Sequence, residues 1–301
     1  MRTRACAVSV LAGALLIAVA AGCTSASTRR SQGTAPPPPS SSASSPSAPV
    51  SPVSTGTHWI IASSAVSKLE GITSSATVAN YLDGPQTTVL TSSTIPSDLS
   101  GWHVTFALDT RSLTEIRSGV DGLSSRISEI LYDPEHWSYT PLTEQLNVGA
   151  STQQAASMAH AAGRQLIVAP ATNLAQASAP GTSAASSFIQ TDDLAKVAAS
   201  ANMVEIQAQG LERNTSRYAA YIAQAVGQIR SANPSATIYA GLSTNPSGGP
   251  VTASELISAV QATSSEVTGY WLNIPSPGTA CPACAEPQPQ LALDLFEQLT
   301  Q

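Results

Sequence analysis

The sequence has few charged and aromatic residues and almost no lysine. Charged side chains make up 11% of the 301 residues and aromatic ones 5%, and lysine occurs only at positions 68 and 196. The arginines are spread along the chain and form no basic cluster. Such a cluster is what binds nucleic acid or an anionic lipid surface, so neither is an expected partner.

The first 22 residues have the layout of a secretory signal. Arg2 and Arg4 precede an apolar stretch from Ala7 to Ala21, which is too short to span a membrane comfortably. The small residues before Cys23 resemble the bacterial lipobox, although alanine stands at position 20 where that pattern prefers leucine. The resemblance implies cleavage before Cys23 and lipidation of its thiol. An ordinary secretory signal that is cleaved nearby is the alternative.

The composition of residues 23–57 predicts a disordered tether. The segment contains "TAPPPPSSSASSPSAPVSPVSTGT", in which proline favours extended geometry and serine keeps the chain solvated. Its length lets a folded domain stand on the order of 100 Å from a membrane. With a lipidated Cys23, the tether predicts an extracytoplasmic protein held to the cell membrane by its lipid. Removal of Arg2 and Arg4 leaves 11 of the 13 basic residues against 19 acidic ones, a net charge of −8.

Two cysteines remain once the signal and the anchor are set aside, Cys281 and Cys284. Outside the cytoplasm, a pair at this spacing is expected to form a disulfide that holds a loop. A thioredoxin-like redox pair is the alternative, but that motif should open a helix after the first strands of a βαβ unit. Here the pair lies near the C-terminus among prolines. A zinc site would need further ligands, so we expect no metal and no cofactor.

From residue 58 onward, short β-branched and aromatic runs alternate with alanine-rich stretches of helical spacing. This alternation predicts a (β/α)8 TIM barrel over residues 58–301. A doubly wound open sheet is the alternative, but no glycine-rich phosphate loop follows the first strand. The predicted strands are 58–63, 87–92, 103–109, 128–133, 165–171, 203–209, 237–243 and 268–273. The predicted helices are 112–125, 151–163, 191–201, 215–232, 252–264 and 288–299, and the second connection is too short for a full helix.

Short motifs mark the ends of the predicted helices. Ser151 and Thr252 each stand three residues before a Gln or a Glu, which is the spacing of a capping box. Asn214 is expected to cap the helix that follows it. The Asn-Pro pair at 233–234 is expected to end that helix.

In a barrel, alternate residues of each strand point inward, and the site gathers at the carboxyl ends of the strands. On the sixth strand this places Glu205, Gln207 and Gln209 toward the axis. Buried polar groups need partners, so a satisfied polar interior is the alternative to a binding site for sugar hydroxyls. The other residues expected to face inward are Glu129, Leu131, Asp133, Tyr239, Gly241, Ser243, Gly269, Trp271 and Asn273, with Asn245 just beyond.

The end of the fourth strand, "SEILYDPE", is similar to the D-x-x-D-x-D-x-E signature of chitinase-type glycoside hydrolases. Asp133 and Glu135 match its last two acids, whereas Ser128 and Leu131 replace the first two and Pro134 replaces the usual aromatic residue. In that family the Glu protonates the leaving oxygen and the Asp steadies the acetamido group of the substrate. The resemblance implies these roles for Glu135 and Asp133.

A two-carboxylate glycosidase is the broader interpretation. It needs an acid and a nucleophile or base on different strand ends, about 5 to 10 Å apart. Asp133 or Glu135 could pair with Glu205, which lies early in its strand, or with Asp109 at the end of the third strand. Capping of the following helix is the alternative role of Asp109.

Over nearly the whole mature domain the chain resembles uncharacterised actinobacterial secreted proteins and lipoproteins with a glycoside-hydrolase-like TIM barrel. The resemblance rests on segments such as "YDPEHWSYTPLTEQ", "VEIQAQ", "AGLSTNP" and "GYWLNIP", and it supplies no reaction. We expect a monomeric lipoprotein that hydrolyses an extracellular or cell-wall glycan, with a non-catalytic glycan- or wall-binding barrel as the alternative. The expected catalytic residues are Asp133, Glu135 and Glu205, and the expected sugar-binding residues are Asn173, Gln207, Gln209, Ser243, Asn245, Trp271 and Asn273.

Overall fold

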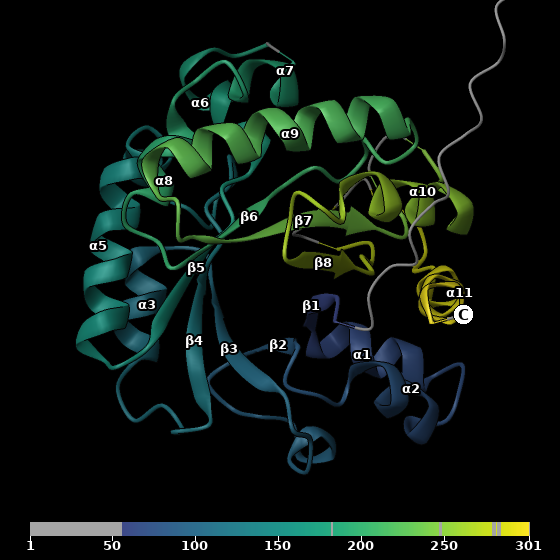
Figure 1. Cartoon of the computed structure of the whole chain (residues 1–301). Helices are drawn as coiled ribbons and strands as arrows, with labels where there is room; N and C mark the ends of the chain where they lie inside the picture. Colours follow the sequence, from purple (N-terminus) through teal and green to yellow (C-terminus); the bar gives the residue numbers. More distant parts are fainter. Residues whose placement is uncertain (1–55, 182, 247–248, 279–280, 282–283, 301) are drawn as a thin grey trace, which may run out of the picture. The chain divides into compact units, whose positions relative to one another are not determined.

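The computed structural model describes residues 56–301 except 182, 247–248, 279–280, 282–283 and 301. These residues belong to one compact unit, Pro49–Gln301. The predicted signal at 1–22 and nearly all of the predicted tether at 23–57 lie outside the described residues. In the described part, parallel strands close into a barrel in sequence order from β1 to β8 (Figure 1). The predicted TIM barrel is therefore confirmed, and the open sheet is excluded.

Each predicted strand corresponds to one strand of the barrel. Boundaries differ by a few residues, mostly because the predicted strands run on into the loops at their carboxyl ends. The strands are β1 His58–Ala62, β2 Thr87–Thr91, β3 Thr105–Thr110, β4 Ile127–Tyr132, β5 Gln165–Val168, β6 Met203–Ile206, β7 Thr237–Ser243 and β8 Gly269–Asn273.

The six predicted helices are α3 Leu113–Gly119, α5 Val148–Ala161, α8 Asp193–Ala198, α9 Thr215–Ala232, α10 Ala253–Thr263 and α11 Pro289–Leu299. Among the described residues, five further helices of four to eight residues were not predicted. These are α1 Ser63–Glu70, α2 Ser75–Leu82, α4 Leu142–Gln145, α6 Ala175–Ser178 and α7 Ala184–Phe188. As predicted, the connection between β2 and β3 holds no full helix, only the 3-10 turn η1 Ser97–Leu99.

Most of the predicted helix ends are confirmed. Thr252 forms a capping box with the third residue of α10, and the Asn214 side chain accepts from a backbone N–H in the first turn of α9. Asn233 ends α9 as expected. The prediction for Ser151 is wrong, because α5 starts earlier, at the buried Val148, and carries Ser151 in its interior.

The capping role considered for Asp109 is also wrong. Asp109 lies within β3, and Ser112 caps α3 by accepting a hydrogen bond from the backbone N–H of Glu115. Asp109 lies near the carboxyl end of the barrel, where its charge acts on Asp133, the residue directly after β4.

Alternation along the strands separates two apolar regions. Residues such as Ile130 and Tyr132 pack outward against the helices, whereas Leu131 between them belongs to a cluster inside the barrel. Each fully buried side chain of this size stabilises the fold by about 1.5–3 kcal/mol. The inner cluster comprises Ile60, Leu90, Ala107, Leu131, Ile167, Ala169, Met203 and Tyr239, with Ala62 and Trp271 packed against it. The predicted inward direction of Leu131, Tyr239 and Trp271 is thus confirmed.

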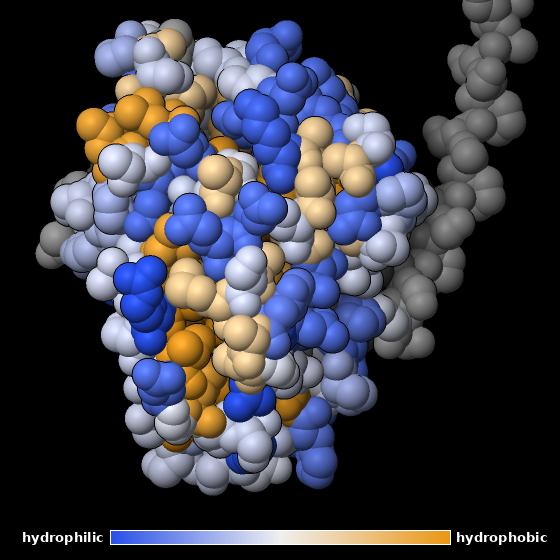
Figure 2. Space-filling view, turned by 90° about the vertical axis from the view of Figure 1, so that its left-hand side faces the viewer, coloured by the Kyte–Doolittle hydropathy of each residue, from blue (hydrophilic) through white to orange (hydrophobic). Residues whose placement is uncertain are grey.

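The surface carries few large apolar side chains. The face shown in Figure 2 is largely hydrophilic, with small separate hydrophobic patches. Among the described residues, the large hydrophobic side chains that are exposed are Ile72, Leu142 and Leu146. Within the same part of the chain, no helix has both the length and the apolar composition that a membrane span requires.

Candidate active site

Four acidic residues come from three strands to the carboxyl end of the barrel. Asp109 lies in β3, Asp133 directly follows β4 and Glu135 lies two residues further, while Glu205 lies in β6. The backbone N–H of Asp133 donates to the carbonyl of Thr110 over 2.8 Å, which continues the pairing of β3 and β4 beyond the strand end. Because all strands of the barrel run parallel, these side chains gather at one end.

Asp133 is the most strongly perturbed of the accessible acids. Asp133 is 8% exposed, and its Oδ1 accepts a 2.7 Å hydrogen bond from Nε2 of Gln207. Burial raises the pKa of Asp133 well above its ordinary value, and the charges of Glu135, Asp109 and Glu205 raise it further. The hydrogen bond from Gln207 opposes this rise only in part. The protonated form of Asp133 is therefore favoured relative to that of an exposed aspartate.

Glu135 is held by Asn173, which comes from η2 (Thr172–Leu174) after β5. Nδ2 of Asn173 donates to Oε2 of Glu135 over 3.3 Å, and its Oδ1 accepts from the backbone N–H of His136 over 2.8 Å. Burial raises the pKa of Glu135, and the Asn173 hydrogen bond opposes the rise. Glu135 remains partly exposed, so it is more accessible than Asp133.

Glu205 lies deepest. It is 0% exposed, and neither carboxylate oxygen has a hydrogen-bond partner of good geometry. Burial raises its pKa well above the ordinary value and the charge of Glu135 adds to this, while the amide of Gln209 lies near enough to oppose the rise. Gln209 lies over Gly241, where any side-chain carbon would collide with its amide. The glycine predicted to face inward thus makes room for Gln209.

Asp109 is exposed to solvent, yet its pKa is raised to about 6, chiefly because surrounding protein atoms exclude much of the water from its carboxyl group. The charge of Arg111 opposes the rise and that of Glu115 supports it. Arg111 itself pairs with Glu115 over 3.0 Å and lies 4.7 Å from the ring centre of Tyr139.

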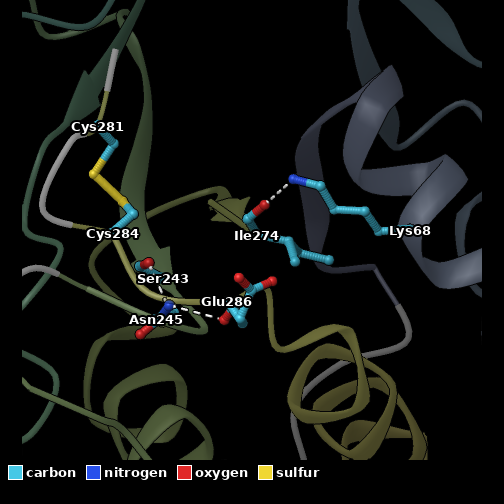
Figure 3. Close-up of a disulfide and its surroundings, with 7 residues drawn as sticks. All are labelled: Lys68, Ser243, Asn245, Ile274, Cys281, Cys284 and Glu286. Carbon is cyan, nitrogen blue, oxygen red and sulfur yellow. Dashed lines mark hydrogen bonds between the residues drawn. A yellow bond between two sulfur atoms is a disulfide. The ribbon is translucent and has the colours of Figure 1, made fainter. Parts of the chain in front are cut away.

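Two predicted sugar-binding residues, Ser243 and Asn245, also make contacts that hold loops together. The backbone N–H of Ser243 donates to Oε1 of Glu212 over 3.0 Å. Nδ2 of Asn245 donates to the carbonyl of Glu286 over 3.0 Å (Figure 3). Asn245 also donates from its backbone N–H to the Ser243 hydroxyl over 3.3 Å. The structure brings Asn173, Gln207 and Gln209 to the acids. The hydrogen bonds of Ser243 and Asn245 are to Glu212, Glu286 and each other, and their sugar-binding role stays a prediction.

The two predicted residues on β8 have different surroundings. Trp271 is partly buried and packs against the cluster inside the barrel, so much of its ring already serves the core. Asn273 ends β8, and its carbonyl accepts from the backbone N–H of Thr244 over 3.0 Å. Asn273 is partly exposed at the carboxyl end of the strand.

Sequence reasoning missed Glu212 and the aromatic pair beside Glu135. Glu212 is 0% exposed and its pKa is raised to about 7, mainly by burial. It follows β6 in a loop, where strand alternation predicts nothing. Trp137 and Tyr139 make an edge-to-face contact with ring centres 5.2 Å apart, and Nε1 of Trp137 donates to Thr140 over 2.8 Å. Both aromatic residues stand in the segment "YDPEHWSY", two and four residues after Glu135, so the sequence carried a signal for an aromatic surface there.

The predicted disulfide between Cys281 and Cys284 is present, with their Cα atoms 5.3 Å apart (Figure 3). Cys281 forms a β-bridge with Gly278 and does not open a helix, which removes the context that a thioredoxin-like redox pair requires. Near this loop, Nζ of Lys68 donates to the carbonyl of Ile274, and burial lowers the pKa of Lys68. The disulfide loop is thus bordered by fixed contacts.

No metal centre is evident among the described residues, and a surface groove lies away from the four acids. No three His, Cys, Asp or Glu side chains among these residues are grouped so that they could hold a metal ion. A surface groove of about 390 Å³ lies on the outer side of α3 and α5, and it is lined by Arg117, Ala150, Gln153, Gln154, Ser157 and Met158. None of the four acids lines this groove, so we place the chemistry at the barrel end.

No protein-family model matches the sequence, and no curated protein matches it significantly. The structure is similar to a chitinase from Chromobacterium violaceum, with 12% identity, 81% of this chain and 99% of the other covered, and a TM-score of 0.46. It is also similar to an α-L-fucosidase described as putative, from Bacteroides thetaiotaomicron. There the identity is 8%, the match covers 70% of this chain and 82% of the other, and the TM-score is 0.47. A third similar structure is the N-terminal domain of a putative aldolase from Bacteroides vulgatus. There the identity is 10%, the match covers 81% of each chain, and the TM-score is 0.42. These remote structural similarities establish neither a family nor a reaction.

Proposed function

We propose that the protein is a glycoside hydrolase that acts on an extracellular or cell-wall glycan at the carboxyl end of its barrel. The observation that supports this proposal is the electrostatic coupling of acids from different strands: Glu135, Asp109 and Glu205 all raise the pKa of Asp133. Hydrolysis of a glycosidic bond requires one carboxyl group that is protonated and one that is ionised. Acids that raise one another's pKa values supply both forms near neutral pH.

The accessibility of the acids suggests their roles. Glu135 is more exposed than Asp133, so it donates the proton to the leaving oxygen, and Asp133 beside it keeps the pair partly protonated. Asp109 is exposed and its pKa of about 6 leaves it mostly ionised at pH 7. It therefore stabilises positive charge on the sugar ring or activates water. Glu205 lies beneath these three and acts through its charge.

Trp137 and Tyr139 supply a surface for the sugar ring next to Glu135. Both rings are partly buried, and they are fixed by their contact with each other and by the hydrogen bond of Trp137 to Thr140. A fixed aromatic ring binds the apolar face of a pyranose with little loss of side-chain entropy. We propose this pair as the stacking surface, a role that Trp271 fills less well because it packs against the inner core.

The location of the protein is part of the proposal. Lipidation of Cys23 and the tether after it would hold the barrel outside the cytoplasm at the membrane surface, within reach of wall glycans. The disulfide between Cys281 and Cys284 supports an oxidising compartment.

A glycan library tests the proposal when cleavage and binding are both measured. Glu135→Gln should lower the turnover of any cleaved glycan by about a hundredfold to ten-thousandfold, because it removes the proton donor while it keeps the shape. Glu266→Gln is the matched control, since Glu266 is exposed in the turn before β8 at the opposite end of the barrel. Equal rates for Glu135→Gln and wild type would contradict the assignment. Binding without cleavage would identify a glycan-binding barrel.

A further inference from the structure

The acidic site has no cation to balance it. In the part of the chain that the structure describes, the three ion pairs are His103 with Asp83, Arg111 with Glu115 and Lys196 with Asp193. None of them includes an acid of the site. Arg111 is the cation whose charge acts on Asp109, but its guanidinium is already bonded to Glu115 and packed on an aromatic ring. The acids therefore present uncompensated negative charge whenever they ionise.

Glu205 gives a second and independent indication of a missing partner. It is fully buried, and neither carboxylate oxygen has a hydrogen-bond donor in good geometry, although the amide of Gln209 lies nearby. Its charge raises the pKa of Asp133, and the charge of Glu135 raises that of Glu205, so it lies within the same cluster. Leaving a buried carboxylate without a partner destabilises the folded protein, and natural proteins keep such groups mainly where a ligand compensates them.

We propose that the site binds a sugar with a free amino group, so that the substrate class is a glycan containing de-N-acetylated hexosamine. This inference rests on the proposed function, since it specifies the sugar that the same site takes. An ammonium group carries a positive charge and three N–H donors, which match carboxylates that only accept. An acetamido group brings no charge and a neutral hydroxyl brings one donor, so neither compensates the cluster.

The accessible acids determine where the ammonium lies. Asp109 is exposed and Glu135 is partly exposed, so both are within reach of a ligand that enters from the carboxyl end of the barrel. Asp133 is 8% exposed, so it is less accessible than these two acids. Glu205 lies below them, without contact to solvent, and strengthens the attraction by its charge. Trp137 next to Glu135 is placed to bind the ring that carries the amine.

Binding of an ammonium should release protons. Without ligand, burial and mutual repulsion keep protons on the cluster, whose titratable members are Asp109, Asp133, Glu135 and Glu205 with Arg111 as the nearby fixed charge. A bound cation favours the ionised carboxylates, so protons leave as the ligand enters. The same linkage makes the affinity fall as the pH is lowered and the carboxylates become protonated. A neutral sugar causes neither effect.

Calorimetry on the full chain with two matched ligands tests the inference. The glucosamine tetramer and the N-acetylglucosamine tetramer differ only in charge and the acetyl group. We expect the glucosamine tetramer to bind about tenfold or more tightly, as close charge pairs at interfaces do. Titration in two buffers of different ionisation enthalpy should show proton release with the glucosamine tetramer and none with the N-acetylated one.

Two variants separate charge from shape. Glu205→Gln and Asp109→Asn should each reduce the preference for the glucosamine tetramer. Because Asp109 is exposed, Asp109→Asn tests the charge even if the substitution at the buried Glu205 impairs folding. Glu129→Gln is the matched control, because Glu129 lies inside the barrel but bonds Thr88 and acts on Tyr239 instead of the cluster. It should leave the preference unchanged. Equal affinity for both tetramers, tighter binding of the N-acetylated one, or no binding of glucosamine would overturn the inference. In each of those cases the glycan library could still show cleavage of a neutral sugar. The proposed hydrolase function is therefore tested separately from the preference for an amino sugar.

Discussion

Nε2 of Gln207 donates a hydrogen bond to Oδ1 of Asp133 over 2.7 Å, and this contact joins the end of β6 to the end of β4. The same nitrogen donates to the carbonyl of Ala169 over 3.1 Å, just beyond β5, the strand between them. One amide therefore connects three consecutive strands and fixes the carboxyl group of Asp133. Residues 74 positions apart in the chain thus define the centre of the candidate site.

Gln207→Met should destabilise the protein by about 1–3 kcal/mol, because it keeps the side-chain length but leaves the buried Asp133 oxygen without its donor. The pKa of Asp133 should rise further, since the Gln207 hydrogen bond lowers it. Urea unfolding measures the first effect. The control is Gln153→Met on the exposed side of α5, which should change the free energy of unfolding by less than about 0.5 kcal/mol. Equal losses for the two variants would show that the contact contributes nothing.

Stability should decrease as the pH rises from 5 to 8. Burial raises the pKa of Glu129 and of Glu212 to about 7, from an ordinary value of 4.5. Between these values the folded protein holds protons that the unfolded chain has lost, so unfolding releases protons and a higher pH favours it. This stabilisation is complete below about pH 4 and is lost as the pH passes about 7.

Thermal unfolding at several pH values measures this dependence, and Glu129→Gln supplies the comparison. The variant cannot ionise, so it should lose less stability than wild type between pH 5 and pH 8, by on the order of 1–3 kcal/mol. A wild-type protein that becomes more stable over this interval would contradict the raised pKa values.

Gly241→Ala should cost about 1–3 kcal/mol, because the new methyl group collides with the amide of Gln209. The obstacle is a flexible side chain, so Gln209→Ala should remove most of the loss. Gly269→Ala is the contrasting case, since there the new methyl group meets the backbone carbonyl of His58, which cannot move aside. It should cost more, and Gln209→Ala should not relieve it. A double-mutant cycle without coupling between positions 241 and 209 would argue against this packing.

The barrel could be predicted because its signals are local and repeated. Each strand is a short β-branched run, and each strand end is marked by a polar residue or a turn, so eight repeats support one another. Alternation within a strand also gave the inward direction of Leu131, Tyr239 and Trp271, and the inner cluster confirms it. What sequence could predict was therefore the fold and the end of the barrel where polar side chains gather.

The finer arrangement depends on contacts between loops that alternation does not describe. Asn173 bonds Glu135 and Asn245 bonds the backbone of Glu286, yet both are asparagines just beyond a strand. Ser151 has the spacing of a helix cap but lies inside α5, because the buried Val148 extends the helix backward. Glu212 lies in a loop and gave no periodic signal. Such partners follow from the path of each loop in space.

The proposed anchor is tested by Cys23→Ser, which removes the thiol that would carry the lipid. The variant should move from the membrane fraction to the medium or the aqueous phase, because the remaining chain lacks the buried acyl methylenes, each worth roughly 0.8 kcal/mol. Phase partitioning of the exported protein measures the change, with Cys281→Ser as a cysteine control that keeps the anchor. A Cys23→Ser protein that stays as firmly bound as wild type would refute lipidation at this position.

A crystal structure of the full chain with a bound glucosamine tetramer tests the central claim most directly. The account predicts that the sugar lies at the carboxyl end of the barrel, with its ammonium within hydrogen-bond distance of Asp109 or Glu135 and a ring against Trp137. Crystals of the Glu135→Gln variant with the same tetramer should retain the uncleaved ligand at this position. Sugar bound only in the groove between α3 and α5, with the four acids still bare, would contradict the claim that these acids form the functional site.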